Sequence, residues 1–209
     1  YHYNKSARTF SQYLGNANGS TLKGKNIYTM CDYGEELVIG IHEEKLLKLH
    51  KRKNTLTDVN APQINYRIIR NVQFINEKLW VGTQFGLFVV DEKHGIVSHL
   101  REEITNPHSL GDNFVEKIYR DKEGGIWVSS YFGGVSYLPN QGMSFERYTP
   151  TLETGTISSK RISVLKEDDK GNVWVGTEDG GLNILNPSSK TFIPNSKKLS
   201  NSTYNMKIL

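Results

Sequence analysis

A motif built around tryptophan recurs along the chain at nearly constant spacing, and this repeat constrains the fold more than any other feature. The aligned positions, separated by 42, 47 and 47 residues, are Val38, Trp80, Trp127 and Trp174. A short apolar run precedes each copy. Periods of about 20 to 50 residues are typical of architectures that stack one supersecondary unit on the next. The copies are LVIGIHEEKLLKLH (37–50), LWVGTQFGLFVV (79–90), IWVSSYFGGVSYLP (126–139) and NVWVGTEDGGLNILNP (172–187).

Each repeat has the pattern of four short strands joined by tight turns. Val, Ile, Tyr, Trp and Phe fill the strand segments, and Gly, Asn, Asp and Pro fill the turns. Helical periodicity is absent over any useful length. Four-stranded units of this length, repeated in series, predict the blades of a β-propeller. Because neighbours cover both faces of a blade, its strands are expected to be apolar at consecutive positions, as in VWVG (173–176).

We expect one all-β segment with four complete blades and two partial ones. Residues 1–13 contain TFSQY, which matches the outermost strand SFERY of a later repeat, and the last residues match the start of a further blade. A blade shared between the two ends would lack its second strand. The chain is therefore expected to be part of a longer propeller, of seven blades, with a small five-bladed ring as the alternative. The predicted units are 1–13, 14–60, 61–105, 106–150, 151–198 and 199–209.

The residues that suggest chemistry within the repeats also have structural explanations. The tryptophans are expected to pack between blades, since a ligand rarely needs the same contact in every repeat. The acidic turns DKEGG (121–125) and DDKGN (168–172) offer too few carboxylates for a calcium loop, and hairpin turns explain them. No helix and no Gly-Lys-Ser/Thr sequence follows the glycine pairs at 133–134 and 180–181, so they are interpreted as turns.

No catalytic residues, metal site or cofactor are predicted. The six histidines lack the spacing typical of metalloenzymes, and no Gly-x-Ser-x-Gly sequence is present. The net charge is +4, but Lys and Arg are dispersed, so no nucleic-acid surface is expected. No apolar stretch approaches the roughly 20 residues of a membrane helix, so the segment is not expected to insert into a membrane. The single cysteine, Cys31, lies in an apolar run and is expected to be a small buried side chain.

Two repeats resemble the two-component regulator propeller repeat. DDKGNVWVGTEDGGLNILNPSSKTF (168–192) shows its acidic turn, its Trp-Val-Gly-Thr strand, its paired glycines and its Asn-Pro before Lys-x-Phe. NPHSLGDNFVEKIYRDKEGGIWVSSYFGGVSYLP (106–139) follows the same pattern, with Ser129-Ser130 in place of Gly-Thr. In the first repeat, Ile41-His42-Glu43-Glu44 replaces the Thr-turn-Gly element. These departures imply that the repeats do not share one ligand motif.

The resemblance implies an extracytoplasmic sensor. Such repeats form the sensor regions of hybrid two-component systems of Bacteroidetes, where two seven-bladed propellers precede a β-sandwich, a membrane helix and a histidine kinase. For this chain the resemblance implies a non-enzymatic, periplasmic segment that recognises glycan-derived oligosaccharides. The parent protein would be a homodimer anchored in the inner membrane that signals to a kinase outside this chain. The alternatives are a propeller enzyme of the polysaccharide or antibiotic lyase type and a protein-interaction propeller.

Ligand-contacting residues are expected on one rim of the propeller. The connections between second and third strands share a face with those between blades, and loops on a rigid scaffold commonly bind ligands. Large aromatic residues stand in two of these turns, and the alternative is that they only cover neighbouring blades. The candidates are His42, Gln84, Phe85, Tyr131, Phe132, Glu178 and Asp179 from the strand connections, and Tyr66, Arg67, Asn113, Lys160 and Arg161 from the segments between blades.

Overall fold

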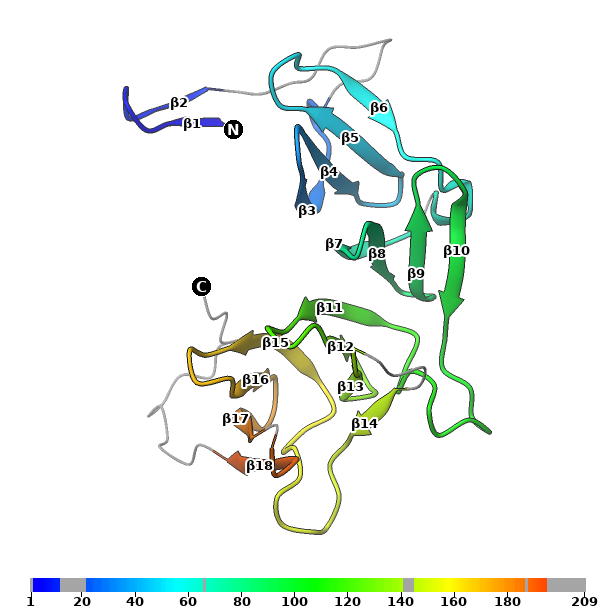
Figure 1. The fold of residues 1–209 in the computed structure, drawn as a ribbon, viewed down its shortest axis with the longest axis vertical. Coiled ribbons are helices and arrows are strands. Elements are labelled where there is room, and N and C mark those ends of the chain that lie inside the picture. Colours follow the sequence, from blue (N-terminus) through cyan, green and yellow to red (C-terminus); the bar gives the residue numbers. More distant parts are fainter. Residues whose placement is uncertain (1, 12–21, 66, 141–144, 187, 195–209) are drawn as a thin grey trace.

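The computed structural model describes residues 2–11, 22–65, 67–140, 145–186 and 188–194. These residues form four four-stranded antiparallel sheets and one two-stranded hairpin (Figure 1). The fold class predicted from the repeats, an all-β propeller segment with four-stranded antiparallel blades, is confirmed. The sheets are called blades 1 to 4 in chain order.

Each blade uses four strands that follow one another in the sequence, so its strands are joined as successive hairpins. Blade 1 contains β3 (Ile27–Tyr33), β4 (Glu36–Ile41), β5 (Leu46–His50) and β6 (Leu56–Asp58). Blade 2 contains β7 (Ile69–Ile75), β8 (Lys78–Thr83), β9 (Gly86–Asp91) and β10 (Gly95–Leu100). Blade 3 contains β11 (Val115–Arg120), β12 (Ile126–Ser130), β13 (Val135–Leu138) and β14 (Glu146–Tyr148). Blade 4 contains β15 (Ile162–Glu167), β16 (Val173–Thr177), β17 (Gly181–Asn186) and β18 (Thr191–Pro194).

The N-terminal segment holds more structure than the single outer strand predicted there. Strand β2 (Thr9–Ser11) pairs with a second strand, β1 (His2–Asn4), in a hairpin. The predicted start of a further blade, 199–209, lies outside the described residues. A short 3-10 helix, η1 (Pro62–Ile64), connects blades 1 and 2. The residue boundaries between blades stay a prediction.

The first strand of every blade lies on the inside of the arc that the blades form (Figure 1). Side chains of these inner strands bond directly to the backbone of the next blade. Thr29 Oγ1 accepts a hydrogen bond from the Val72 backbone N–H at 3.1 Å, and Asn71 Oδ1 accepts one from the Ile118 N–H at 3.0 Å. Both polar side chains are buried, so these bonds satisfy groups that would otherwise be costly to remove from water.

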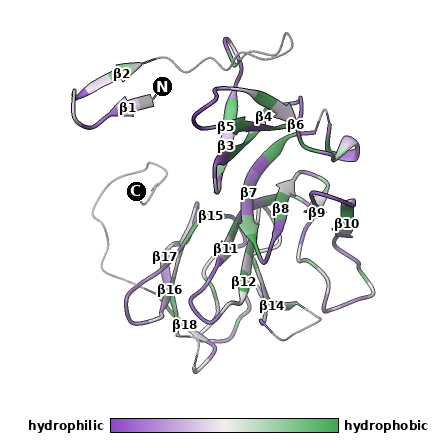
Figure 2. Cartoon of the chain, turned by 45° about the horizontal axis from the view of Figure 1, so that its top comes forward, coloured by the Kyte–Doolittle hydropathy of each residue, from purple (hydrophilic) through white to green (hydrophobic). Residues whose placement is uncertain are grey.

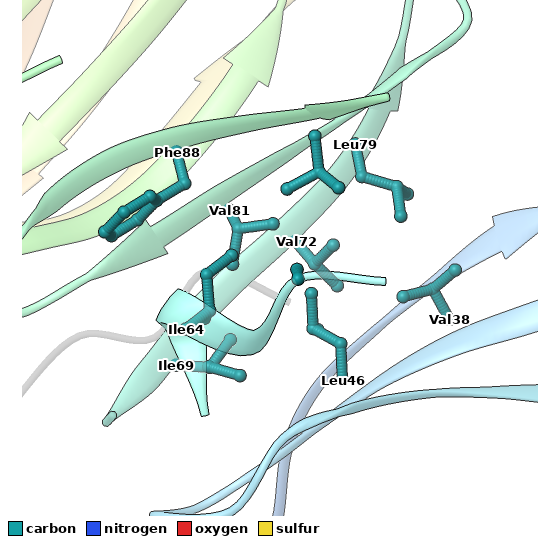
Figure 3. Close-up of a cluster of buried hydrophobic side chains, with 10 residues drawn as sticks. Val38, Leu46, Ile64, Ile69, Val72, Leu79, Val81 and Phe88 are labelled. Atoms are coloured by element: carbon teal, nitrogen blue, oxygen red, sulfur yellow. The ribbon is translucent and has the colours of Figure 1, made fainter. Parts of the chain in front are cut away.

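The hydrophobic core is divided among the contacts between blades. One cluster joins Val38 and Leu46 of blade 1 to Ile69 and Val81 of blade 2, with Ile64 of the connecting helix beside them (Figure 3). Hydrophobic segments lie within the sheets and hydrophilic ones at the connecting turns (Figure 2). The apolar runs predicted from stacking are confirmed, because all five residues of β12 are buried.

Two of the three recurring tryptophans pack in clusters between blades. Trp127 is 2% exposed and belongs to the cluster between blades 3 and 4, and Trp80 packs, partly buried, against the cluster between blades 2 and 3. Trp174, in the last described blade, is only partly buried. Cys31, predicted to be buried, is partly buried at the edge of the first cluster, where desolvation raises the pKa of its thiol to about 11.

The glycine of the repeated Gly-Thr pair lies at a closely packed point of the second strand. A Cβ atom added at Gly82 would lie 2.7 Å from Val115 Cγ1 in the inner strand of blade 3. Gly40 faces Ile69 of blade 2 in the same way, at 2.9 Å from its Cγ2. Blade 3 carries Ser129 at this position, fully buried, and its hydroxyl has no hydrogen-bond partner among the described residues. At Gly82 the next blade therefore occupies the space of a side chain, whereas at Gly176 the inner strand of the same blade does so, with Val164 Cγ1 at 2.5 Å.

We predict opposite effects of alanine at these two equivalent positions. Gly82→Ala should lower the free energy of unfolding by ~1–3 kcal/mol, because Val115 must move out of a packed core. Ser129→Ala should leave that free energy unchanged or raise it by ~1 kcal/mol, because it removes an unpaired buried hydroxyl. Denaturant unfolding of the two variants and the parent chain measures both values. A Ser129→Ala protein as unstable as Gly82→Ala would contradict this explanation.

Candidate functional site

Every inner strand carries a β-bulge at the same place. In β3, Ile27 and Thr29 pair with consecutive residues of β4, which leaves Tyr28 as the extra residue. The same irregularity occurs near the start of β7, β11 and β15. A bulge leaves one residue outside the ladder and redirects its side chain. The four extra residues, one from each blade, are Tyr28, Arg70, Glu116 and Ser163.

Arg70 connects the first three blades at this rim. Its Cζ atom lies 5.8 Å from the ring centroid of Tyr28 and 5.0 Å from that of Phe114, at the start of blade 3. Its Nε atom lies 3.8 Å from Glu116 Oε1 and, although buried, has no hydrogen-bond partner among the described residues. A guanidinium is attracted to the faces of aromatic rings. Arg70 is therefore held between two rings and keeps an unused donor.

Aromatic rings continue from Phe114 towards blade 4. The ring centroids of Phe114 and Tyr131 are 5.5 Å apart, and those of Tyr131 and Phe132 are 4.6 Å apart in an edge-to-face arrangement. The Cζ atom of Arg161 lies 5.3 Å from the Tyr131 centroid and 5.8 Å from that of Phe132. Phe132 is 58% exposed, so this rim presents an apolar ring to solvent beside a cation.

Arg161 also faces two carboxylates at the tip of the β16–β17 turn. Its Nη1 atom lies 3.8 Å from both Glu178 Oε2 and Asp179 Oδ2. At the opposite end of the row, the His42 ring packs on Tyr28 with centroids 4.5 Å apart. Contacts thus run without a break from blade 1 to blade 4. We call this set the inner-rim cluster: Tyr28, His42, Arg70, Phe114, Glu116, Tyr131, Phe132, Arg161, Glu178 and Asp179.

The acidic groups of the inner-rim cluster influence one another across blades. Burial raises the pKa of Glu116, and the positive charge of Arg70 offsets this only in part. The negative charge of Glu178, on blade 4, raises the same pKa further. The cluster therefore offers carboxylate and guanidinium groups beside apolar rings, which is a set of groups suited to orienting a polar ligand.

Half of the predicted rim residues join the inner-rim cluster, and those of the other half that the structure describes have other contacts or surroundings. Arg67 stacks on Phe85 with its Cζ 4.5 Å from the ring centroid, and the Phe85 carbonyl bonds to the His99 ring nitrogen Nε2 at 2.8 Å. Asn113 bonds through its backbone carbonyl to the Gly86 N–H at 2.7 Å. The carbonyl of Lys160 accepts a hydrogen bond from Gly134, Gln84 is partly buried, and Tyr66 lies outside the described residues. A role in ligand binding stays a prediction for all of these residues.

The turn-based prediction missed four members of the cluster: Tyr28, Arg70 and Glu116 on inner strands, and Phe114 directly before β11. One signal for two of them exists in the sequence, because Arg70 and Glu116 are charges near the start of the predicted strand segments IIRNVQFI and FVEKIY. The bulge that redirects them leaves no signal of its own.

The acidic turns hold the tryptophans in place. Asp168 Oδ2 accepts a hydrogen bond from the Trp174 indole N–H at 2.9 Å, and Asp121 Oδ2 accepts one from Trp127 at 2.8 Å. Their other carboxylate oxygens accept bonds from backbone N–H groups of the same turns. Blade 2 has a two-residue turn without an aspartate, and the buried indole nitrogen of Trp80 has no partner among the described residues. These carboxylates therefore stabilise the hairpin turns and orient the tryptophan side chains.

The described residues can be compared with what a metal site and a membrane-spanning helix require. Within the described ranges, His, Cys, Asp and Glu side chains form no group of three or more that could hold a metal ion. The same ranges contain no helix with the length and apolar character needed to cross a membrane.

Four-stranded antiparallel blades, stacked around an arc with their first strands innermost, define this chain as a β-propeller segment. Within that class, residues 109–132 and 156–179 match the two component regulator propeller family. Each match covers the first two strands of its blade and the start of the turn that follows. No curated protein is significantly similar to the chain in sequence.

Solved structures of larger proteins share the fold. The extracellular domain of the hybrid two component system BT4673 from B. thetaiotaomicron is 18% identical, with a TM-score of 0.68 over 87% of this chain and 27% of that chain. That of BT3049 from the same organism is 22% identical, with a TM-score of 0.66 over 80% and 24%. PorZ, a surface component of the type-IX secretion system of Porphyromonas gingivalis, is 12% identical, with a TM-score of 0.64 over 92% and 29%. The chain therefore spans about a quarter of the length of these proteins.

We predict an acid-dependent contribution of Asp168 to stability. Hydrogen bonds from Asn172, Trp174 and the turn backbone hold the pKa of this carboxyl well below its ordinary value of 3.8. The stabilisation is fully present above pH 3.8 and is lost as the pH falls towards the folded-state pKa, because the unfolded chain takes up the proton first. Asp168→Asn should lower the melting temperature at pH 7, and the difference from the parent chain should shrink below pH 3.8.

Asp169→Asn is the matched control, because Asp169 is exposed and makes no hydrogen bond to Trp174. Thermal melts of both variants from pH 7 to pH 2 give the comparison. Equal effects of the two substitutions at pH 7 would show that the turn bonds contribute nothing.

Proposed function

We propose that this chain is a ligand-sensing part of the periplasmic region of a hybrid two-component system, without catalytic activity of its own. The family match in blades 3 and 4 supports this proposal, as does the likeness in fold to extracellular domains of such systems. The parent protein is a homodimer anchored in the inner membrane, with a histidine kinase outside this chain. The segment itself neither binds nucleic acid nor enters the membrane.

The inner-rim cluster is the surface that receives the ligand in this proposal, and the ligand is a glycan-derived oligosaccharide. The observation that carries it is the exposed Phe132 ring, which lies beside Arg161 and its carboxylates. A sugar ring has an apolar face that packs on an aromatic ring, and hydroxyl groups at its edge that bond to guanidinium and carboxylate groups. Arg70 adds a buried donor without a partner among the described residues.

The contacts within the cluster also offer a route from ligand to signal. The cluster joins side chains of all four described blades, and a ligand seated on it touches more than one of them. A ligand changes an equilibrium between arrangements only when it binds one of them better. A ligand that binds one placement of neighbouring blades or subunits better makes that placement more populated, and this change of arrangement is what reaches the kinase.

We predict that Phe132→Ala weakens oligosaccharide binding by about 3- to 10-fold, the loss expected for one aromatic stacking contact. Isothermal titration calorimetry of the chain with a panel of neutral oligosaccharides measures the dissociation constants. Phe10→Ala is the matched control, because it removes another largely exposed Phe from the N-terminal hairpin, outside the inner-rim cluster.

Two results would overturn the proposal: no binding of any oligosaccharide in the panel, or an equal effect of the two alanine substitutions. Turnover of a bound sugar that is lost in Glu178→Gln would instead favour the enzyme alternative.

A further inference from the structure

A pocket of about 320 Å³ lies between blades 3 and 4, away from the inner-rim cluster. It opens at the edge of the sheets where β11 turns into β12 and β15 turns into β16, whereas the cluster lies at the edge of the β12–β13 and β16–β17 turns. Both blades contribute walls, for example Tyr137 from blade 3 and Val173 from blade 4. The volume is at the lower end of the range for small-molecule sites, about 300–1,000 Å³.

Aromatic rings form one part of this pocket. The Trp127 ring lies 4.2 Å from that of Tyr137 and 6.0 Å from that of Tyr148, measured between centroids. The hydrogen bond from the Trp127 indole to Asp121 fixes the indole plane. Burial, together with nearby carboxylates, raises the pKa of Tyr137 to about 12, so its phenol stays neutral. The pocket thus has rigid, electron-rich, uncharged rings.

Carboxylates dominate the charge of the pocket. Asp121, Glu123, Glu146 and Glu167 line it, against the single ammonium of Lys190. Glu167, whose side chain is 5% exposed, accepts hydrogen bonds from the Tyr119 hydroxyl at 3.0 Å and the Lys122 backbone at 3.2 Å. Glu123 is exposed, and no hydrogen bond or ion pair of its carboxylate is present within the described ranges. Glu146 faces the ammonium of Lys190 and Glu167 that of Lys122 at 3.9 Å, so among the described lining residues the excess of negative charge comes from Asp121 and Glu123.

Lys190 shows which ligand group this environment accepts. It stands in the β17–β18 turn of blade 4 and reaches across to blade 3, where its Nζ atom lies 2.7 and 2.9 Å from the two carboxylate oxygens of Glu146. An ammonium thus already occupies part of the pocket wall. A second ammonium would meet the remaining carboxylates and the faces of the rings, both of which attract cations.

We infer that this pocket binds a small organic cation: a primary ammonium carried on a body about the size of one sugar ring. The body packs on the partly exposed rings of Tyr137 and Tyr148, and the ammonium lies at the mouth beside Glu123. Anions are disfavoured by the carboxylates, and neutral sugars gain only the contact with the rings. This site does not rest on the function proposed for the inner-rim cluster.

The test uses three sugars that differ mainly in charge and in the group on one carbon: glucosamine, N-acetylglucosamine and glucose. Titration of each into the chain, followed by tryptophan fluorescence, gives the dissociation constants. We expect glucosamine to bind at least about 10-fold more tightly than the two neutral sugars, and its affinity to fall as salt is added, because salt screens charge. Equal affinities for the three sugars would overturn the inference.

Three variants locate the site. Glu123→Gln should weaken glucosamine binding by about 2- to 5-fold, as expected for one exposed ion pair, and Lys190→Met should strengthen it by removing a competing ammonium. Glu77→Gln is the matched control, since it makes the same charge change in the corresponding turn of blade 2, where Glu77 is also exposed. An effect of Glu123→Gln no larger than that of Glu77→Gln would place the cation elsewhere and reject the assignment.

The two sites can fail separately. Phe132→Ala should leave glucosamine binding unchanged, and Glu123→Gln should leave the binding of neutral oligosaccharides unchanged. Glucosamine binding that is lost in Phe132→Ala would move the cation to the inner-rim cluster and contradict the pocket.

Discussion

The contact of each blade with the next is the constraint on which the rest of the structure depends. A four-stranded sheet of about 30 residues cannot bury both faces by itself, and here the largest side-chain clusters lie between blades. Close stacking requires that the second strand of one blade admit the inner strand of the next, and at Gly82 the space for a side chain is taken by Val115. The repeat glycine at position 82 thus follows from the close packing of blade 3 against blade 2.

The inner rim follows from the same contact. The bulges in β3, β7, β11 and β15 all occur where the inner strand pairs with the second strand at the Gly-Thr position. A backbone hydrogen bond is lost from the ladder there, and in blades 2 and 3 a side chain from the preceding blade supplies an acceptor nearby. The extra residues leave the packed layers, which makes polar and charged side chains tolerable beside an apolar core.

The sequence predicted the parts of this protein that depend on periodicity. The repeat spacing and the turn residues were sufficient for the four-stranded blades, and the acidic turns were correctly interpreted as hairpins. Members of the cluster on strand connections, such as Phe132 and Glu178, were also found, because aromatic and acidic residues are conspicuous in turns. Arg70 and Glu116 were missed because a bulge changes the direction of a side chain through pairing with another strand, which no local pattern reveals. The pocket between blades 3 and 4 was missed for a related reason, since its walls come from turns about 45 residues apart that only stacking brings together.

The four bulge residues differ completely in chemistry, although the strands that carry them are equivalent. A phenol, a guanidinium, a carboxylate and a hydroxyl occupy one structural position in successive blades. Duplication of a blade therefore copies an adjustable position together with its scaffold. A propeller of this kind can acquire a new recognition surface by single exchanges at these positions, because none of them belongs to the apolar core.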